Sequence, residues 1–323
     1  MVFRRIGCPE PAERGYNAKL AFLFYKCKFL NQKLCEIWGM GIRKIHLPAI
    51  LALFLTACGN GSEGDDAKQA SVASGVPPAA NIAYTVVNSY PHDTAAFTQG
   101  LELYKGKLME STGLMGRSSL RKVDIQTGKI LSAINMSDDI FAEGITILRD
   151  TLYQLSWQNH EVYVYDIKKE PKKVATLPWS GEGWGVTNDG IQLIISDGSD
   201  KLYLVEPGTL KLKKVLSIRD QYGAVNNLNE LEMIDGYIFA NRWQYDYILK
   251  IDPSSGFVVG TLSMQDFLKK NSKKDLSYLD KPGSTAQQSG AVLNGIAYDP
   301  VKKSIYITGK LWPEVFEIKL QKD

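Results

Sequence analysis

The sequence predicts an all-β fold, a five-bladed β-propeller of four-stranded antiparallel blades. Three observations predict it: a motif recurring about every 40 residues, strand-like segments after each copy, and turn sequences between copies. Propellers consist of four-stranded units of about 40–45 residues, repeated four to eight times. Five units need about 200–225 residues, and residues 82–323 supply that length. A doubly wound α/β fold is disfavoured, because a helical pattern appears only around residues 264–270.

The recurring motif is a polar or aromatic residue followed, in four of the five copies, by glycine and an apolar residue. Its copies are Gln99-Gly100-Leu101, Glu143-Gly144-Ile145, Trp184-Gly185-Val186, the degenerate Asn229-Glu230-Leu231, and Asn294-Gly295-Ile296. The second strands that follow are predicted at 107–112, 151–157, 191–197, 237–243 and 304–310. Third strands are predicted at 162–166, 201–205, 248–252 and 315–318. These segments alternate apolar and polar residues or are short runs rich in Val, Ile and Tyr, as strands require.

Residues 40–58 have the layout of a bacterial lipoprotein signal. Met40 is followed by two basic residues, by an apolar run over 47–57 and by Cys58. The run is shorter than the roughly 20 residues that span a bilayer. The sequence Leu-Thr-Ala-Cys at 55–58 resembles a lipoprotein box, in which the cysteine is lipidated. We therefore expect residues 40–57 to be a signal peptide, and an exported protein held in the bacterial cell envelope through Cys58. A plain signal peptide or a core strand is the alternative.

The segments on either side of this signal are expected to have no part in the function. Residues 1–39 are interpreted as upstream sequence from a misassigned start codon, because a basic region directly follows Met40. Residues 58–81 are rich in Gly, Ser and Asp and are predicted to be a flexible tether. Residues 82–323 are then the catalytic propeller. A polar insertion at 263–290 is expected to loop over one face with its charges in solvent.

Charge, cysteine and histidine content exclude several classes of function. The formal net charge of +3 contains +4 from residues 1–39 and +2 from residues 40–57, which leaves −3 for the remainder. No basic field remains to attract nucleic acid. All four cysteines precede residue 59, and only His92 and His160 follow it. A thiolate site, a cysteine nucleophile and a catalytic zinc site are therefore not expected, and no cofactor or metal is predicted.

The residue that begins each motif copy is predicted to face the central channel, because the first strand of a propeller blade lines that channel. The ring is Gln99, Glu143, Trp184, Asn229 or Glu230, and Asn294. Each side chain alone could be structural, satisfying buried backbone groups or filling the hub. Together they form a poor hydrophobic plug but a good pocket for a polar ligand.

Glu143 is the strongest candidate for proton transfer. Its neighbours in sequence are apolar, and a carboxyl group in such surroundings has a raised pKa suited to acid–base work near neutral pH. The alternative is a buried glutamate paired with a cation, for which Lys310 is the obvious partner; the two interpretations can coexist. Trp157, Trp184 and Trp243 follow channel-side segments and could each be packing residues or, together, an aromatic slot for an amide side chain.

Motifs of several common enzyme classes are missing from the sequence. It contains no GxSxG nucleophile elbow, P-loop, GxGxxG fingerprint or plausible Ser-His-Asp set. Any chemistry must therefore rest on a carboxylate, amides and aromatic side chains.

Several segments resemble one known family. They are PHDTAAFTQGLE (91–102), FAEGIT (141–146), LYQLSWQN (152–159), GEGWGVT (181–187), LNELE (228–232), ANRW (240–243) and LNGIAYD (293–299). In this order they are similar to glutamine cyclotransferases of the plant and bacterial type, over residues 82–320. The resemblance implies a five-bladed propeller that converts an N-terminal glutamine of a peptide to pyroglutamate and releases ammonia. The family's pocket then corresponds to Phe97, Gln99, Phe141, Glu143, Trp157, Trp184, Asn229, Trp243 and Lys310.

The resemblance also implies roles and partners. Glu143 is expected to be the general acid/base, with Gln99, Asn229 and Lys310 orienting the amide, and the five aromatic residues binding substrate. The expected partners are peptides or proteins with N-terminal Gln, with membrane contact only through the lipid anchor and the protein itself a monomer. The alternative is a lipid-anchored propeller that binds a peptide or glycan and catalyses nothing. A hydrolase with the same pocket would require a positioned water.

Overall fold

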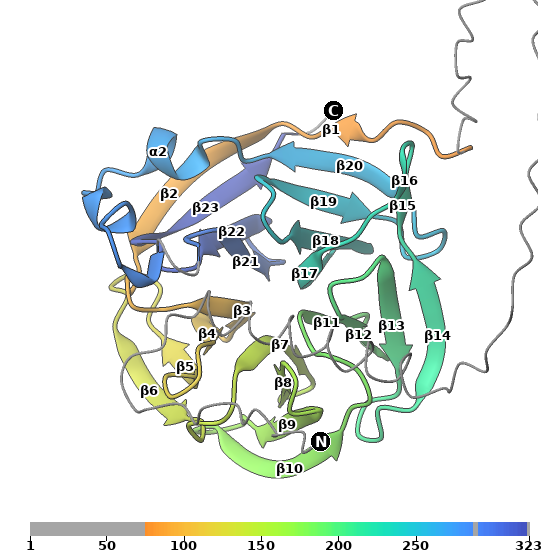
Figure 1. Ribbon diagram of the computed structural model, residues 1–323, viewed down its shortest axis with the longest axis horizontal. Helices are drawn as coiled ribbons and strands as arrows, with labels where there is room; N and C mark the ends of the chain where they lie inside the picture. Colours follow the sequence, from red (N-terminus) through yellow and green to blue (C-terminus); the bar gives the residue numbers. More distant parts are fainter. Residues whose placement is uncertain (1–74, 287–289, 322–323) are drawn as a thin grey trace, which may run out of the picture. The chain divides into compact units, whose positions relative to one another are not determined.

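The structure, a computed structural model, describes residues 75–286 and 290–321 and forms a five-bladed β-propeller (Figure 1). Five antiparallel sheets surround a central channel, each with its first strand innermost. The innermost strands contact one another in sequence order, and the last contacts the first. The predicted fold, blade number and four-stranded antiparallel blades are thus confirmed. Cys58 and the predicted leader lie outside the described residues.

The first three blades each use four consecutive strands. The first contains β3 (Thr98–Tyr104), β4 (Lys107–Thr112), β5 (Ser119–Val123) and β6 (Ile130–Asn135). The second contains β7 (Ala142–Leu148), β8 (Thr151–Ser156), β9 (Glu161–Asp166) and β10 (Lys172–Pro178). The third contains β11 (Val186–Asn188), β12 (Leu193–Ser196), β13 (Lys201–Val205) and β14 (Leu212–Ser217). A short hairpin of β15 (Arg219–Asp220) and β16 (Gly223–Ala224) follows.

The last two blades each include a strand that precedes the first blade in the sequence. The fourth contains β17 (Leu228–Ile234), β18 (Tyr237–Arg242), β19 (Tyr247–Ile251) and β20 (Val258–Ser263), with β1 (Ala80–Asn81) parallel to β20. The fifth contains β21 (Leu293–Asp299), β22 (Ser304–Gly309) and β23 (Glu314–Leu320), and β2 (Tyr84–Pro91) is its outer strand. Strand pairing between the two ends of the propeller therefore closes the ring. The repeat predicts a fourth strand in this blade but not its origin, and residues 80–81, which were predicted to belong to the tether, instead form β1.

Neighbouring inner strands approach each other so closely near the axis that the second position of the repeated motif has no room for a side chain, which explains its glycine. A β-carbon on Gly100 would lie 2.5 Å from the backbone nitrogen of Ile145, and one on Gly144 would lie 2.8 Å from the Cα of Gly185. Real side chains do not tolerate such distances. The fourth blade lacks this glycine, and Glu230 occupies the position. Its carboxyl group instead crosses toward two other blades, accepting hydrogen bonds from the backbone nitrogens of Leu101 (3.2 Å) and Ile296 (2.9 Å).

Four of the five predicted ring residues lie at irregularities of the innermost strands, whereas Trp184 directly precedes β11. The pairing of inner and second strands shifts register at Gln99, between Ala142 and Ile145, between Leu228 and Leu231, and between Leu293 and Ile296. Residues 143–144, 229–230 and 294–295 occupy these last three irregularities. A bulge redirects a side chain from the plane of the sheet, and bulges are frequent beside active sites. The repeat thus gives four blades a redirected polar side chain at equivalent positions.

The insertion after the fourth blade is only partly solvated. It contains α2 (Phe267–Asn271) and η1 (Ser277–Leu279). Phe267 and Leu268 are buried in an apolar cluster with residues of the fourth and fifth blades, whereas Lys269 and Lys270 are exposed. The charges thus lie in solvent as expected, and the apolar residues attach the segment to the propeller. No helix among the described residues is long and apolar enough to cross a membrane.

Candidate active site

The predicted catalytic carboxyl, that of Glu143, is buried at the start of the inner strand β7. The residue is 6 % exposed. Burial raises the pKa of its carboxyl well above the ordinary value; the positive charge of Lys310 partly opposes this, and the negative charge of Glu182 adds to it. A carboxyl group with a raised pKa is a stronger base near neutral pH than a free one.

Lys310 brings a buried amine to the same site. It follows β22, is 4 % exposed, and its backbone nitrogen donates to the carbonyl of Val292 at 2.9 Å. Burial lowers the pKa of Lys310 to about 8, with the charge of Glu143 acting in the opposite direction. Its Nζ lies 4.7 Å from the centre of the Phe97 ring. Among the described residues, no ion pair within 4.0 Å joins Lys310 to Glu143, so the two interact through space.

The five predicted aromatic residues form two contacting groups. Phe97 meets Phe141 edge-on with ring centres 6.2 Å apart, and Phe141 meets Trp157 at 5.8 Å. Trp184 and Trp243 form a second edge-to-face pair at 5.7 Å. Phe97 is buried, while the other four are only partly buried and present ring surface to solvent. By contrast Trp179 and Trp312 are buried in the core.

A residue that the sequence analysis did not select, Glu182, joins the two aromatic groups. Its Oε2 accepts hydrogen bonds from the indole nitrogens of Trp157 (2.9 Å) and Trp184 (3.0 Å). Its Oε1 accepts one from the side-chain amide of Gln158 at 2.7 Å. The residue lies in the GEGWG segment, whose glycines and tryptophan drew attention while its acid did not. The indication in the sequence was an acidic residue two positions before Trp184, a tryptophan already selected for the candidate site.

The amide side chains of the ring are oriented by one another. Asn294 donates from Nδ2 to the backbone oxygen of Thr98 (3.0 Å) and to Oε1 of Gln99 (3.3 Å). With its oxygen engaged, Gln99 keeps its NH₂ group for another acceptor. The Oδ1 atoms of Asn229 and Asn294 are buried and have no hydrogen-bond partner within the described part of the chain. Buried polar atoms without partners are rare in proteins and are expected where a ligand or water binds.

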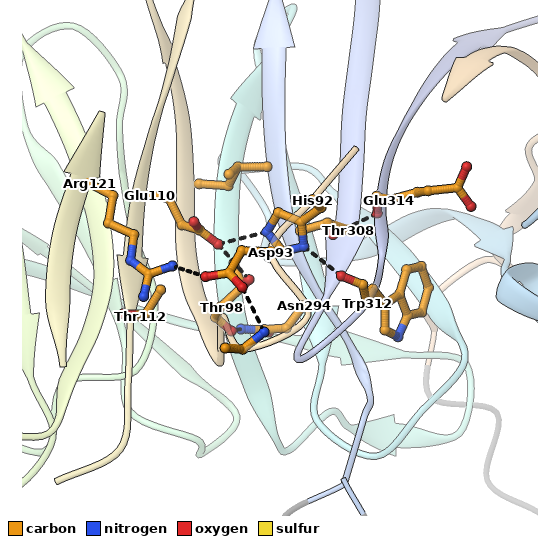
Figure 2. Close-up of polar contacts among 12 residues, drawn as sticks. His92, Asp93, Thr98, Glu110, Thr112, Arg121, Asn294, Thr308, Trp312 and Glu314 are labelled. Atoms are coloured by element: carbon orange, nitrogen blue, oxygen red, sulfur yellow. Dashed lines mark hydrogen bonds and ion pairs between the residues drawn. The ribbon is translucent and has the colours of Figure 1, made fainter. Parts of the chain in front are cut away.

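A buried ion pair between His92 and Glu110 lies next to this ring of side chains. Figure 2 shows His92 between Glu110 and the backbone of Trp312: Nε2 lies 2.9 Å from Oε1 of Glu110 and Nδ1 lies 2.7 Å from the Trp312 oxygen. Thr98 donates its hydroxyl to the same Glu110 oxygen at 2.8 Å. Burial lowers the pKa of His92, but the Glu110 carboxylate outweighs burial and raises it overall. The pair connects the end of β2 to the first blade directly beside Gln99.

Three further carboxyl groups interact electrostatically in the inner strands β3 and β17. Burial raises the pKa of Glu102 to about 8, and burial raises the pKa values of Glu230 and Glu232 well above normal, each with a contribution from Glu102. Backbone nitrogens and the Thr146 hydroxyl donate to these groups. Across residues 75–286 and 290–321, no group of three or more His, Cys, Asp or Glu side chains has the arrangement of a metal site.

Contacts connect the predicted site residues that the structure describes into one region of the propeller. Ring contacts and the Glu182 hydrogen bonds join Lys310, Phe97, Phe141, Trp157, Trp184 and Trp243, and Glu143 faces Lys310 and Glu182 electrostatically. Gln99 lies beside Phe141, because a β-carbon added to Gly113 would come within 3 Å of both side chains, and Asn229 joins through the close approach of its backbone to Gly185. Cys58 lies outside the described residues. A cavity of about 480 Å³ is lined largely by described residues of the insertion at 263–290, and its lining includes none of the predicted residues.

Comparisons with known proteins agree on one family. The family model described as glutamine cyclotransferase matches residues 53–320. A curated Arabidopsis thaliana protein named glutaminyl-peptide cyclotransferase is 39% identical over 238 residues, which are 73% of this chain and 71% of that protein. The crystal structure of Myxococcus xanthus glutaminyl cyclase superposes with a TM-score of 0.67 at 32% identity, covering 75% of this chain and 98% of that one.

Proposed function

This chain is an enzyme of the glutamine cyclotransferase family, and from that premise we propose that Glu143 is the group that moves the proton in its reaction. The substrates are peptides and proteins that begin with glutamine. The products are the same chains beginning with pyroglutamate, and ammonia.

The reaction is an intramolecular acyl transfer. The α-amino nitrogen of the substrate attacks the carboxamide carbon of its own side chain, and a new C–N bond closes the five-membered ring. Glu143, as a carboxylate, takes a proton from the attacking nitrogen and delivers it to the departing amide nitrogen. The old C–N bond breaks and ammonia leaves, so the enzyme returns to its starting protonation state.

The amides and the lysine are proposed to hold the reacting carboxamide. Lys310 in its charged form and the NH₂ group of Gln99 supply hydrogen bonds to the oxygen that becomes negative as the ring closes. The unpartnered Oδ1 of Asn229 accepts from an N–H of the substrate. Such fixed groups act without reorganising during the reaction, and losing one donor of this kind costs about 10²–10³ in rate.

The aromatic residues are proposed to fold the glutamine side chain back onto its own amine. Holding two reacting groups at bonding distance removes much of the entropic barrier of ring closure. Phe97, Phe141 and the three tryptophans also keep bulk water from the carboxamide. Water in that position would favour hydrolysis to glutamate, so the apolar walls favour cyclisation.

The observation that most supports this proposal is the buried Glu143 carboxyl, with its raised pKa, beside the buried amine of Lys310. The test is mass spectrometry of a Gln-initiated peptide incubated with the enzyme, with Asn- and Glu-initiated peptides in parallel. We expect loss of one ammonia from the Gln peptide alone. A folded enzyme that leaves the Gln peptide at the spontaneous rate would favour a propeller that only binds peptides or glycans.

We also propose that the enzyme is a lipoprotein of the bacterial cell envelope, anchored through Cys58. The support is the sequence of residues 40–58 alone: a short basic region, an apolar run and a lipoprotein box. Expression in bacteria with a radiolabelled fatty acid tests this. Label should enter the wild-type chain but not Cys58→Ser, whereas equal labelling of both would contradict the anchor.

A further inference from the structure

Three side-chain N–H donors converge on the carboxylate of Glu182, and this arrangement requires an acid. Two indole groups, those of Trp157 and Trp184, point at Oε2, and the amide of Gln158 points at Oε1. A glutamine in this position would offer one acceptor oxygen and one NH₂ group, and the NH₂ group cannot accept a hydrogen bond. Only a carboxylate satisfies all three donors.

The backbone around Glu182 is fixed as firmly as its side chain. The indole of Trp179, which is packed in the core, donates to the Glu182 carbonyl at 3.1 Å. The nitrogen of Gly183 donates to the carbonyl of Trp157 at 3.1 Å. The backbone at Glu182 is therefore tied to core residues between the second and third blades, and its carboxylate connects this backbone to the two partly exposed tryptophans.

We propose that Glu182 is a positioning residue of the cyclisation reaction, which sets the angle of two pocket walls and places a fixed negative charge beside Glu143. This inference rests on the proposed function, in which Trp157 and Trp184 confine the substrate and Glu143 moves the proton. The Glu182 side chain then both positions the two tryptophans and adjusts the basicity of Glu143. The walls cannot move apart without breaking charge-assisted hydrogen bonds, which are about twice as strong as neutral ones.

The negative charge of Glu182 raises the pKa of Glu143, which makes the Glu143 carboxylate a stronger base for the reaction. The charged groups acting on Glu143 among the described residues are Lys310, which lowers its pKa, and Glu182, which raises it. Burial is the largest cause that raises the pKa of Glu143. Without Glu182, burial alone would oppose the lysine, and the Glu143 carboxylate would be a weaker base. The two charges thus balance each other across the proton-transferring group.

Two substitutions separate the charge of Glu182 from its hydrogen bonds. Glu182→Gln removes the charge but keeps the size and one acceptor oxygen. Glu182→Asp keeps the charge but withdraws it by one methylene from the indoles. Gln158→Leu serves as a control, because it removes one donor and leaves both the charge and the tryptophan bonds.

The measurement is kcat and kcat/KM of the full enzyme against pH, with one Gln-initiated peptide throughout. We expect Glu182→Gln to move the acidic limb of kcat/KM to lower pH by about one unit, because a nearby like charge typically raises a carboxyl pKa by that order. Glu182→Asp should leave this limb in place and lower kcat. A purely structural residue would lower the rate without moving the limb.

Several outcomes would overturn the inference. One is a Glu182→Gln profile that superposes on the wild-type profile after scaling. If that variant does not fold, a Glu182→Asp enzyme with wild-type kcat would overturn it instead. Failure of the proposed function is distinguishable, because then the folded wild-type enzyme would itself leave the peptide unchanged.

Discussion

No β-carbon fits between Gly185 and the backbone oxygen of Asn229, where the third and fourth blades meet at the axis. The motif glycines therefore set the radius of the ring, and the radius sets the distances between side chains that reach into the channel. The same geometry explains why the polar motif residue and the glycine recur together.

Gly185→Ala should destabilise the protein by about 1–3 kcal/mol, because its methyl group forces two inner strands apart. The matched control is Gly181→Ala in the same GEGWG segment, where the nearest atom to a new β-carbon is a side-chain nitrogen 3.2 Å away. Urea denaturation followed by tryptophan fluorescence measures both. Equal losses of stability in the two variants would contradict the claim that Gly185 is required for the close approach of the third and fourth blades.

Glu143→Gln should abolish turnover while leaving substrate binding and folding nearly intact, since the amide has the same shape but cannot take up a proton. Exposed Glu170, which bonds Lys122 and Ser132 on the outside of the propeller, gives the control Glu170→Gln. Steady-state kinetics and calorimetric binding of a Gln-initiated peptide are the measurements. An activity within tenfold of wild type would exclude Glu143 as the proton-transferring group.

Lys310 should produce an alkaline limb in kcat/KM near pH 8, because its lowered pKa of about 8 means that its positive charge is lost there. Lys310→Arg keeps the charge at all accessible pH values and should remove this limb, at reduced overall rate. Lys310→Met should lower kcat by about 10²–10³ below pH 8. The deficit should shrink at higher pH, where the wild-type lysine has itself lost its charge. Using one peptide for all three enzymes cancels the titration of the substrate amine. An unchanged limb in the arginine variant would assign the titration to another group.

His92→Gln should destabilise the protein more at pH 6 than at pH 9. The folded-state pKa of His92 is raised above 6.5, so its contribution is complete below 6.5 and is lost as the pH rises through the folded value. Removing one partner of a buried pair typically costs about 3–5 kcal/mol, because the other charge remains buried.

Exposed His160, which contacts only a backbone oxygen among the described residues, provides the control His160→Gln. Chemical denaturation of all three proteins at both pH values gives the comparison. A His92→Gln deficit that stays constant from pH 6 to pH 9 would show that the histidine contributes through packing rather than charge.

The repeat predicted the fold, and local patterns together with the family resemblance predicted the residues of the candidate site, most of which lie together in the structure. The second strand 107–112 and the third strand 201–205 coincide with β4 and β13. The origin of the outer strand β2 was not predicted, because its partner β23 lies more than 200 residues away and periodicity has no information on such pairing.

Glu182 and the His92–Glu110 pair were missed for a related reason. A single acid in a glycine-rich segment looks like a turn residue until the three donors around it are located, and two of those donors come from another blade. His92 and Glu110 are individually unremarkable in the sequence. They form an ion pair because both are buried and lie close together, and neither their burial nor their distance can be read from the sequence.

The strand β2 also fixes the order of events during synthesis. This strand is made more than 200 residues before its partner β23, so four sheets can form before the outer strand of the fifth finds its partner. A chain that stops before residue 314 leaves β2 unpaired and the edge of β22 open, and unpaired edges invite aggregation. The ring can therefore close only after β23 has been made, and only then is the channel that contains Glu143 and Lys310 complete.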